Sequence, residues 1–86
     1  MPANAVIRRI DLSSAWKALA ESPLIADIAI LVHSKNVDPC AILGDADQEV
    51  TLAQGTQITL RGVDMNEVFV KGTAGDVLAV IGATRT

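Results

Sequence analysis

Regular alternation of apolar and polar residues is the feature that most limits what this chain can fold into. In the stretch "EVTLAQGTQITL" (residues 49–60), Val50 and Leu52 alternate with polar residues, and the alternation resumes after Gln54-Gly55. Side chains at every second position lie on one face of a β-strand, and a short glycine-containing break between two such runs is typical of a hairpin. We therefore predict a β-hairpin that turns at Gln54-Gly55 and leaves one face exposed to solvent.

The preceding stretch, "IADIAILVHS" (residues 25–34), has the same strand character. It is rich in branched aliphatic residues, which favour strands. One predicted face carries Ile28, Ile30 and Val32, and the other carries Asp27, Ala29, Leu31 and His33. Turn-forming residues follow in "SKNVDP", and then a short apolar strand, "CAILG".

The stretch "VFVKGTAGDVLAVIG" (residues 68–82) combines glycines with a lysine and an aspartate, so a phosphate-binding loop has to be considered. Such a loop places its lysine after the glycines, at the start of a helix. Here Lys71 precedes the glycines and a strand-like pattern follows. We therefore predict a second hairpin, with glycine supplying positive φ in the turn and Asp76 accepting amide hydrogen bonds that close it.

Helix-favouring composition is confined to "DLSSAWKALAES" (residues 11–22). Asp11 or Ser13 can act as an N-cap, several alanines follow, and Pro23 would end a helix. We predict a short helix near residues 13–22. An extended or irregular path is the alternative, because a helix of about a dozen residues is marginal without packing support.

The spacing of these elements predicts the fold class. Short strands at intervals of about ten residues, separated by turn residues, are typical of all-β sandwiches and barrels. We predict an all-β fold: a small antiparallel β-sandwich, jelly-roll-like, with the one short helix near residues 13–22. A single domain is expected over residues 1–86, with 1–24 as an N-terminal strand and short-helix segment, 25–82 as the sandwich and 83–86 as a flexible tail.

Charge and hydrophobicity argue against nucleic acid and membrane as partners. The net charge is −3 and the seven Lys and Arg residues are scattered, whereas nucleic-acid binding needs a clustered basic footprint. The first residues lack the apolar core of a signal peptide. No apolar run approaches the roughly 20 residues of a membrane helix. We expect a protein made in a cytoplasm.

Residues able to carry chemistry are few. The single cysteine, Cys40, lies in an apolar stretch and is predicted to be a buried thiol. Asp45, Asp47 and Glu49 form an acidic loop whose spacing does not match a calcium-binding loop of the EF-hand type. A solvated loop is the simpler interpretation.

The single histidine, His33, does not form a nucleophilic pair locally. Its neighbour Ser34 points to the opposite face of a strand, which leaves a pair with Cys40 across the turn as the alternative. We predict that the protein is not an enzyme and has no catalytic residues, no cofactor and no metal site.

Several strands carry apolar residues on both faces, which indicates an interface. Half of the 86 residues are apolar, and a domain of this size buries only about 60–65% of its unfolded surface. The cover for the second face is either the segment 11–24, anchored by Trp16, or another subunit. The predicted interface residues are Trp16, Leu31, Phe69, Leu78 and Val80.

The run from Ile30 to Gly82 resembles small virion structural proteins of tailed bacteriophages. The resemblance lies in the L-x-x-G-x-x-x-x-L pattern of Leu52, Gly55 and Leu60, and in the final "VFVKGTAGDVLAVIG". It departs from that pattern in the phenylalanine at Phe69, where tyrosine is frequent, and in the short loop Asp45–Glu49, and it does not extend to residues 1–24.

The resemblance implies a non-enzymatic β-sandwich located in the virion and made in the host cytoplasm. It implies a capsid decoration (cement) protein, a fibre or spike base, or a connector. The expected partners are copies of itself, with a trimer favoured, and other virion proteins such as the major capsid protein. One alternative is a β-sandwich binding module for a carbohydrate or host-surface ligand, and another is a small jelly-roll enzyme, for which one histidine is too few.

Overall fold

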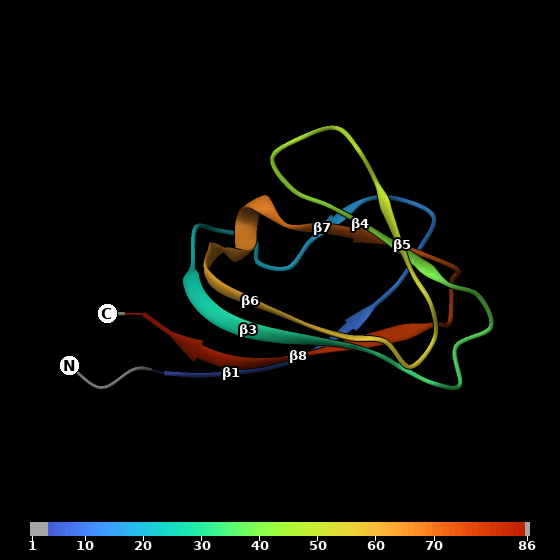
Figure 1. Cartoon of the computed structure of the whole chain (residues 1–86), viewed down its shortest axis with the longest axis horizontal. Helices are drawn as coiled ribbons and strands as arrows, with labels where there is room; N and C mark the ends of the chain where they lie inside the picture. The colour runs from blue at the N-terminus through green and yellow to red at the C-terminus, as the bar shows by residue number, and fades with distance from the viewer. Residues whose placement is uncertain (1–3, 86) are drawn as a thin grey trace.

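Strands make up almost all of the regular structure (Figure 1). The computed structural model describes residues 4–85. The elements are β1 (Ala5–Asp11), β2 (Lys17–Ala18), β3 (Ile25–Val32), β4 (Cys40–Leu43), β5 (Val50–Leu52), β6 (Gln57–Asp64), the 3-10 helix η1 (Met65–Glu67), β7 (Phe69–Lys71) and β8 (Val77–Thr84).

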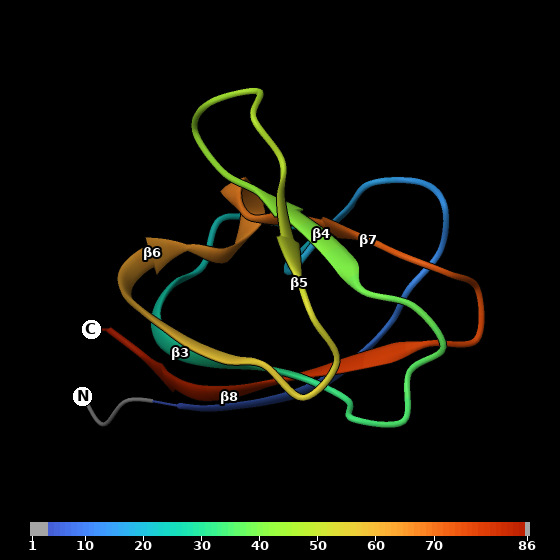
Figure 2. The ribbon, with the colours of Figure 1, turned by 45° about the vertical axis from the view of Figure 1, so that its right-hand side comes forward.

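The strands form two antiparallel four-stranded sheets, seen as two layers in Figures 1 and 2. Sheet A has the order β1-β8-β3-β6, and sheet B has the order β2-β7-β4-β5. The first strand pairs with the last, the second with the seventh, the third with the sixth and the fourth with the fifth. This is the pairing of one long hairpin wrapped into two sheets, which is the jelly-roll arrangement. The predicted all-β, jelly-roll-like sandwich is confirmed.

Alternation in the central strands produces the core. In β3, Ala26, Ile28, Ile30 and Val32 are buried and the residues between them are more exposed. The neighbouring strand β8 buries its alternate residues in the same layer. Each large apolar side chain buried in this way stabilises the fold by about 1.5–3 kcal/mol. The face assignment predicted for β3 is therefore correct.

Both predicted hairpins are wrong in their pairing, although their turns are present. β5 pairs with β4 and β6 with β3, and β7 and β8 likewise lie in different sheets. The turns are closed by hydrogen bonds from Thr56 N to Ala53 O and from Asp76 N to Thr73 O, and Gly55 and Gly75 have positive φ. A glycine turn redirects the chain locally, but the sheet that buries each apolar face decides which strands pair.

The helix predicted near residues 13–22 is wrong. The chain bends after Ser13 and forms β2, which pairs with β7, and Leu19 N donates to Val68 O at 3.0 Å. Leu12, Leu19 and Ala20 are buried against the core. Packing at the edge of sheet B supplies both the hydrogen bonds and the burial, and it overrides a weak helix propensity.

The sandwich extends beyond the expected range of residues 25–82 at both ends. The segment before residue 25 contributes β1 and β2, and β8 continues to Thr84. Arg85 forms an ion pair with Asp27, so residues 83–85 are not a free tail, while Thr86 lies outside the described residues. The two ends of the described chain lie side by side, where Thr84 N donates to Asn4 O at 2.9 Å (Figures 1 and 2).

A buried carboxylate ties together two loops at the other end of the sandwich. Asp76 is 4% exposed and accepts hydrogen bonds from Val37 N at 2.9 Å and Asp38 N at 3.1 Å. Asn36 adds a two-way contact with the backbone of Val77, at 2.8 and 3.0 Å. Asp76 thus does accept amide hydrogen bonds, but from a distant loop rather than from its own turn.

Candidate interaction surfaces

The outward face of sheet A carries an apolar stripe. Ile7 pairs with Ile81, and Ile81 pairs with Ala29, so these residues form one row across three strands. Ile7 is 76% and Ile81 is 48% exposed. In the next row, Ala79 lies beside Leu31. We call these five residues the outer stripe. Contiguous exposed apolar surface of this kind marks sites of protein contact.

A polar contact borders the outer stripe and fixes the end of β8. The Asp27 carboxylate accepts from Gly62 N at 2.6 Å and from Arg85 Nε at 2.9 Å. The Arg85 hydrogen bond, followed by that from Gly62, holds the pKa of Asp27 below its ordinary value. The contact ties β3, β6 and the residue after β8 together.

The open side of the sandwich between β5 and β6 contains an apolar hollow of about 560 Å³. β5 is only three residues long, so it leaves part of β6 uncovered. The apolar lining includes Ile42, Val50, Leu52, Ile58, Leu60 and Val63, and the acidic lining residues are Asp45, Asp64 and Glu67. No basic residue of the described chain lines it. Its chemistry is therefore apolar with an acidic rim.

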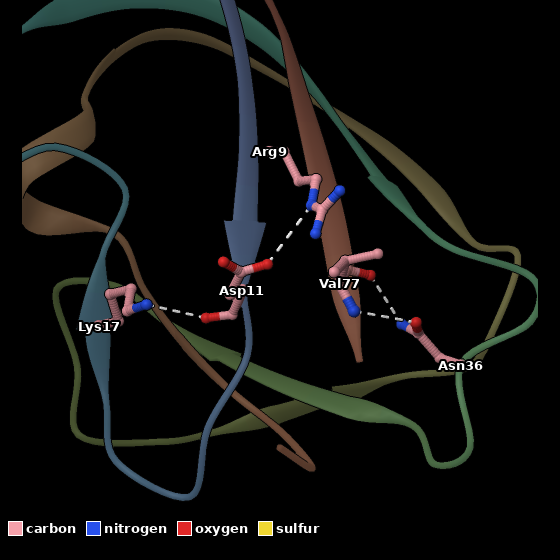
Figure 3. A network of polar contacts seen from close by, with 5 residues as sticks. All are labelled: Arg9, Asp11, Lys17, Asn36 and Val77. Carbon is pink, nitrogen blue, oxygen red and sulfur yellow. Dashed lines mark hydrogen bonds and ion pairs between the residues drawn. The ribbon is translucent and has the colours of Figure 1, made fainter. Parts of the chain in front are cut away.

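The opposite open side, between β1 and β2, contains a hollow of about 740 Å³ with the reverse charge. Its charged lining residues are Arg8, Arg9, Lys17 and Glu21. Figure 3 shows Asp11 between Arg9 and Lys17, which approach it from opposite sides: Arg9 Nε lies 3.4 Å from the carboxylate, and Lys17 Nζ donates to the backbone carbonyl at 2.8 Å. We call this site the basic hollow.

The outward face of sheet B carries the two large aromatic side chains. Lys71 Nζ lies 4.7 Å from the centroid of the Trp16 ring and 3.5 Å from a Glu49 carboxylate oxygen. A cation over an indole face contributes about 0.5–1 kcal/mol at an exposed site. Phe69, two residues from Lys71 on β7, pairs with Leu43 and is half-buried.

The predicted interface residues separate into two groups. Trp16 is 37% exposed, and Leu31 and Phe69 are half-buried on outward faces, so these three are available to a partner. Leu78 and Val80 are 1% and 0% exposed in the core between the sheets, so their prediction as interface residues is wrong. Strand alternation identified two faces on β8, but alternation alone does not tell which one points inward.

The prediction missed Ile7 and Ile81, the most exposed large residues of the outer stripe. For Ile81 the sequence shows only that it shares a strand face with Ala79 and alternates with Leu78 and Val80, which leaves open which face is buried. Ile7 alternates with the buried Val6 and is followed by two arginines, which is the pattern of an edge strand.

Cys40 and His33 are the remaining candidates for chemistry, and His33 lines a shallow hollow beside Leu31 and Ala79 of the outer stripe. Cys40 is a buried thiol, as predicted, and burial raises its pKa. His33 is exposed, and its Nδ1 accepts from Lys35 N at 3.0 Å. Among residues 4–85, no group of three or more His, Cys, Asp or Glu side chains is placed to hold a metal ion. No helix in that range has the length and apolar character needed to cross a membrane.

The strand order, the shared core and the exposed outer stripe define a small jelly-roll β-sandwich. The sequence matches no protein-family model and no curated protein. Among solved structures, it is similar to a chain of Bacillus endospore appendages, which form a family of disulfide-linked pili. The TM-score is 0.58 with 19% sequence identity, over 96% of this chain and 83% of that chain. At this identity, the similarity shows a shared fold.

Proposed function

We propose that this protein is a non-enzymatic structural building block that associates with further copies of itself through the outer stripe of sheet A. The observation that carries the proposal is the cross-strand pair Ile7 and Ile81, whose exposed fractions are 76% and 48%. Burying this row against another sheet would remove apolar surface from water at about 25 cal/mol per Å². The similar chain belongs to a pilus, which supports assembly as the role of this fold.

Within that role, the sequence resemblance favours a virion protein: a capsid decoration or cement protein, or a fibre or spike base, forming trimers and contacting the major capsid protein. Jelly-roll domains are frequent in viral capsids, which supports this finer proposal. An assembled bacterial appendage is the other setting that the similar structure suggests. Mass spectrometry of purified virions and of purified surface appendages would distinguish the two settings.

A carbohydrate-binding role has one observation in its favour. Trp16 and Phe69 both lie on the outward side of sheet B, and sugar sites rely on exposed aromatic rings. Lys71 Nζ already covers the Trp16 ring at 4.7 Å, so a sugar would have to displace it. Glycan-array binding that is lost in Trp16→Ala would establish this function.

The test of the main proposal is the association state in solution. In sedimentation velocity at micromolar concentration, we expect the native protein to form oligomers and Ile81→Lys to remain monomeric with unchanged thermal unfolding. Val37→Lys is the matched control, because Val37 is 74% exposed but lies in the loop after β3, away from the outer stripe. A native protein that stays monomeric at about 100 µM would contradict the proposal.

A further inference from the structure

The loop between β4 and β5, residues 44–49, stands clear of the sandwich in both views (Figures 1 and 2). All of its residues are exposed, and it carries Asp45, Asp47 and Glu49. Glu49 has an ion pair with Lys71, whereas Asp45 and Asp47 take part in none of the ion pairs within residues 4–85. The loop therefore presents negative charge that the rest of the same copy does not neutralise.

The basic hollow lies on the other side of the sandwich, since β1 and β2 are at the opposite sheet edges from β6 and β5. Arg8 alternates with Arg9 along β1, so it shares the inward face of Val6 and Ile10 and lines the hollow together with Lys17, whereas Arg9 lies on the outward face of sheet A and pairs there with Asp11. Glu21 is the one acidic lining residue. Arg8 and Lys17 each donate to a backbone carbonyl, which holds them at the site. The hollow is therefore locally positive, whereas the chain as a whole has a net charge of −3.

We propose that the basic hollow receives the acidic loop 44–49 of a second copy. The two surfaces have opposite charge, and complementary charge steers association and fixes which surfaces meet. The hollow has a volume of about 740 Å³. The inference rests on the proposed function, in which copies associate, and adds to the outer stripe a contact governed by charge.

Loop and hollow lie on opposite sides of one copy, so the contact joins different surfaces of the two partners. Each pair then keeps one free loop and one free basic hollow. Addition of further copies through the same contact either closes into a ring or extends as an open filament.

Reversal of charge on each side of the contact tests the inference. The hollow variant is Arg8→Glu with Lys17→Glu, and the loop variant is Asp45→Lys with Asp47→Lys. Each variant alone places like charges in contact, and we expect its association to weaken at least tenfold. An equimolar mixture restores opposite charges at every contact, so its association returns to within about threefold of the native protein. Sedimentation velocity at low salt measures both effects.

The matched control is Lys35→Glu with Arg61→Glu, which makes the same change in net charge outside the hollow and should associate like the native protein. Folded variants that associate normally, or a mixture that stays dissociated, would overturn the inference while the outer stripe remains supported by the loss in Ile81→Lys. A native protein that is monomeric throughout would instead remove the proposed function together with this inference.

A cross-linking experiment covers the case in which a charge variant fails to fold. Lys17→Cys and Asp47→Cys proteins, mixed and oxidised, should form a mixed disulfide, because the loop tip of one copy enters the hollow of the other. The Lys35→Cys protein mixed with Asp47→Cys is the control for random collision. An equal yield of cross-linked product in the two mixtures would contradict the inference.

Discussion

Gly82 is the residue at which the sheet tolerates no side chain. It pairs with Ile28 in the centre of sheet A. A Cβ added there would collide with the carbonyl oxygen of Asp27 and lie 2.8 Å from the Cα of Ile28. Both obstacles are backbone atoms, so they cannot rotate away, and β3 and β8 would have to separate to admit a methyl group.

We therefore expect Gly82→Ala to lower the free energy of unfolding by about 3 kcal/mol or more, at the upper end of overpacking effects. Urea denaturation followed by circular dichroism measures the change. Gly44→Ala is the control, because a Cβ at Gly44 meets nothing within 4 Å, and its effect should stay within about 0.5 kcal/mol. Equal stability of the two variants would show that the β3–β8 approach is looser than described.

Asp27 gives the protein a specific sensitivity to acid. Hydrogen bonds from Arg85 and Gly62 favour the charged carboxylate, so the pKa of Asp27 is lower in the folded state than its ordinary value of 3.8. Its contribution to stability is therefore complete above about pH 4 and is lost as the pH falls through the folded pKa.

In Asp27→Asn, this part of the acid dependence should be absent. We expect the native protein to be more stable than the variant at pH 6, with the difference shrinking towards pH 2. Thermal unfolding at a series of pH values measures it. Parallel pH profiles for the two proteins would show that Asp27 does not gain stability from Arg85 and Gly62.

At the scale of elements, the loops depend on a few buried hydrogen bonds. Both carboxylate oxygens of Asp76 accept hydrogen bonds from the loop that follows β3, one from Val37 N and one from Asp38 N. Removal of an acceptor leaves donors unsatisfied at a cost of about 1–3 kcal/mol. Asp76→Ala should therefore lower the free energy of unfolding by that amount, and Asp76→Asn, which keeps one acceptor oxygen, should lower it by less.

Amide hydrogen exchange gives a local readout of the same contact. The amides of Val37 and Asp38 should lose protection from exchange in Asp76→Ala. The Ile30 amide, in the centre of sheet A, should lose only as much protection as the lower global stability accounts for. Unchanged protection at Val37 would mean that other contacts hold this loop.

The sequence predicts an element well when residues within that element determine its structure, and poorly when residues far away in the chain do. β3 was predictable because alternation within one segment separates its two faces, and only one of them, with Ile28, Ile30 and Val32, is free of polar residues. The hairpins failed because Gly55 and Gly75 define turns, whereas strand pairing depends on residues far away in the chain. The segment around Trp16 failed for a similar reason: β2 exists because Val70 and Phe69 pair with it.

The candidate surfaces were predictable only in part. Two-faced apolar strands correctly indicated surplus apolar surface, but the choice between Leu78 and Ile81 required knowledge of which face of β8 meets sheet B. The basic hollow was not predictable, because Arg8 and Lys17 come together only through the curvature of the chain between β1 and β2.

For the whole molecule, the single cysteine determines what kind of assembly is possible. Cys40 is 1% exposed and its pKa is raised by burial, and both properties suppress thiol exchange. The similar appendage chain belongs to disulfide-linked pili, so assembly of these 86 residues would differ in being non-covalent.

We therefore expect oligomers to persist unchanged in excess dithiothreitol, as measured by sedimentation velocity. Native Cys40 should also react with a thiol reagent only as fast as the protein unfolds. Dissociation on reduction would show that a disulfide links the copies.

The position of β8 also affects how the protein is made. Although β8 is the last of the described strands, it lies between β1 and β3. During synthesis, both of its neighbours are therefore made before the strand that connects them in the sheet. Sheet A can be completed only after residues 77–84 have left the ribosome. Until then β1 has no partner and β3 pairs only with β6, so apolar strand edges remain exposed and prone to aggregate. A truncated product that ends before Val77 would therefore lose two strands of the sheet, β8 and the β1 that pairs with it, and keep only the β3–β6 pair.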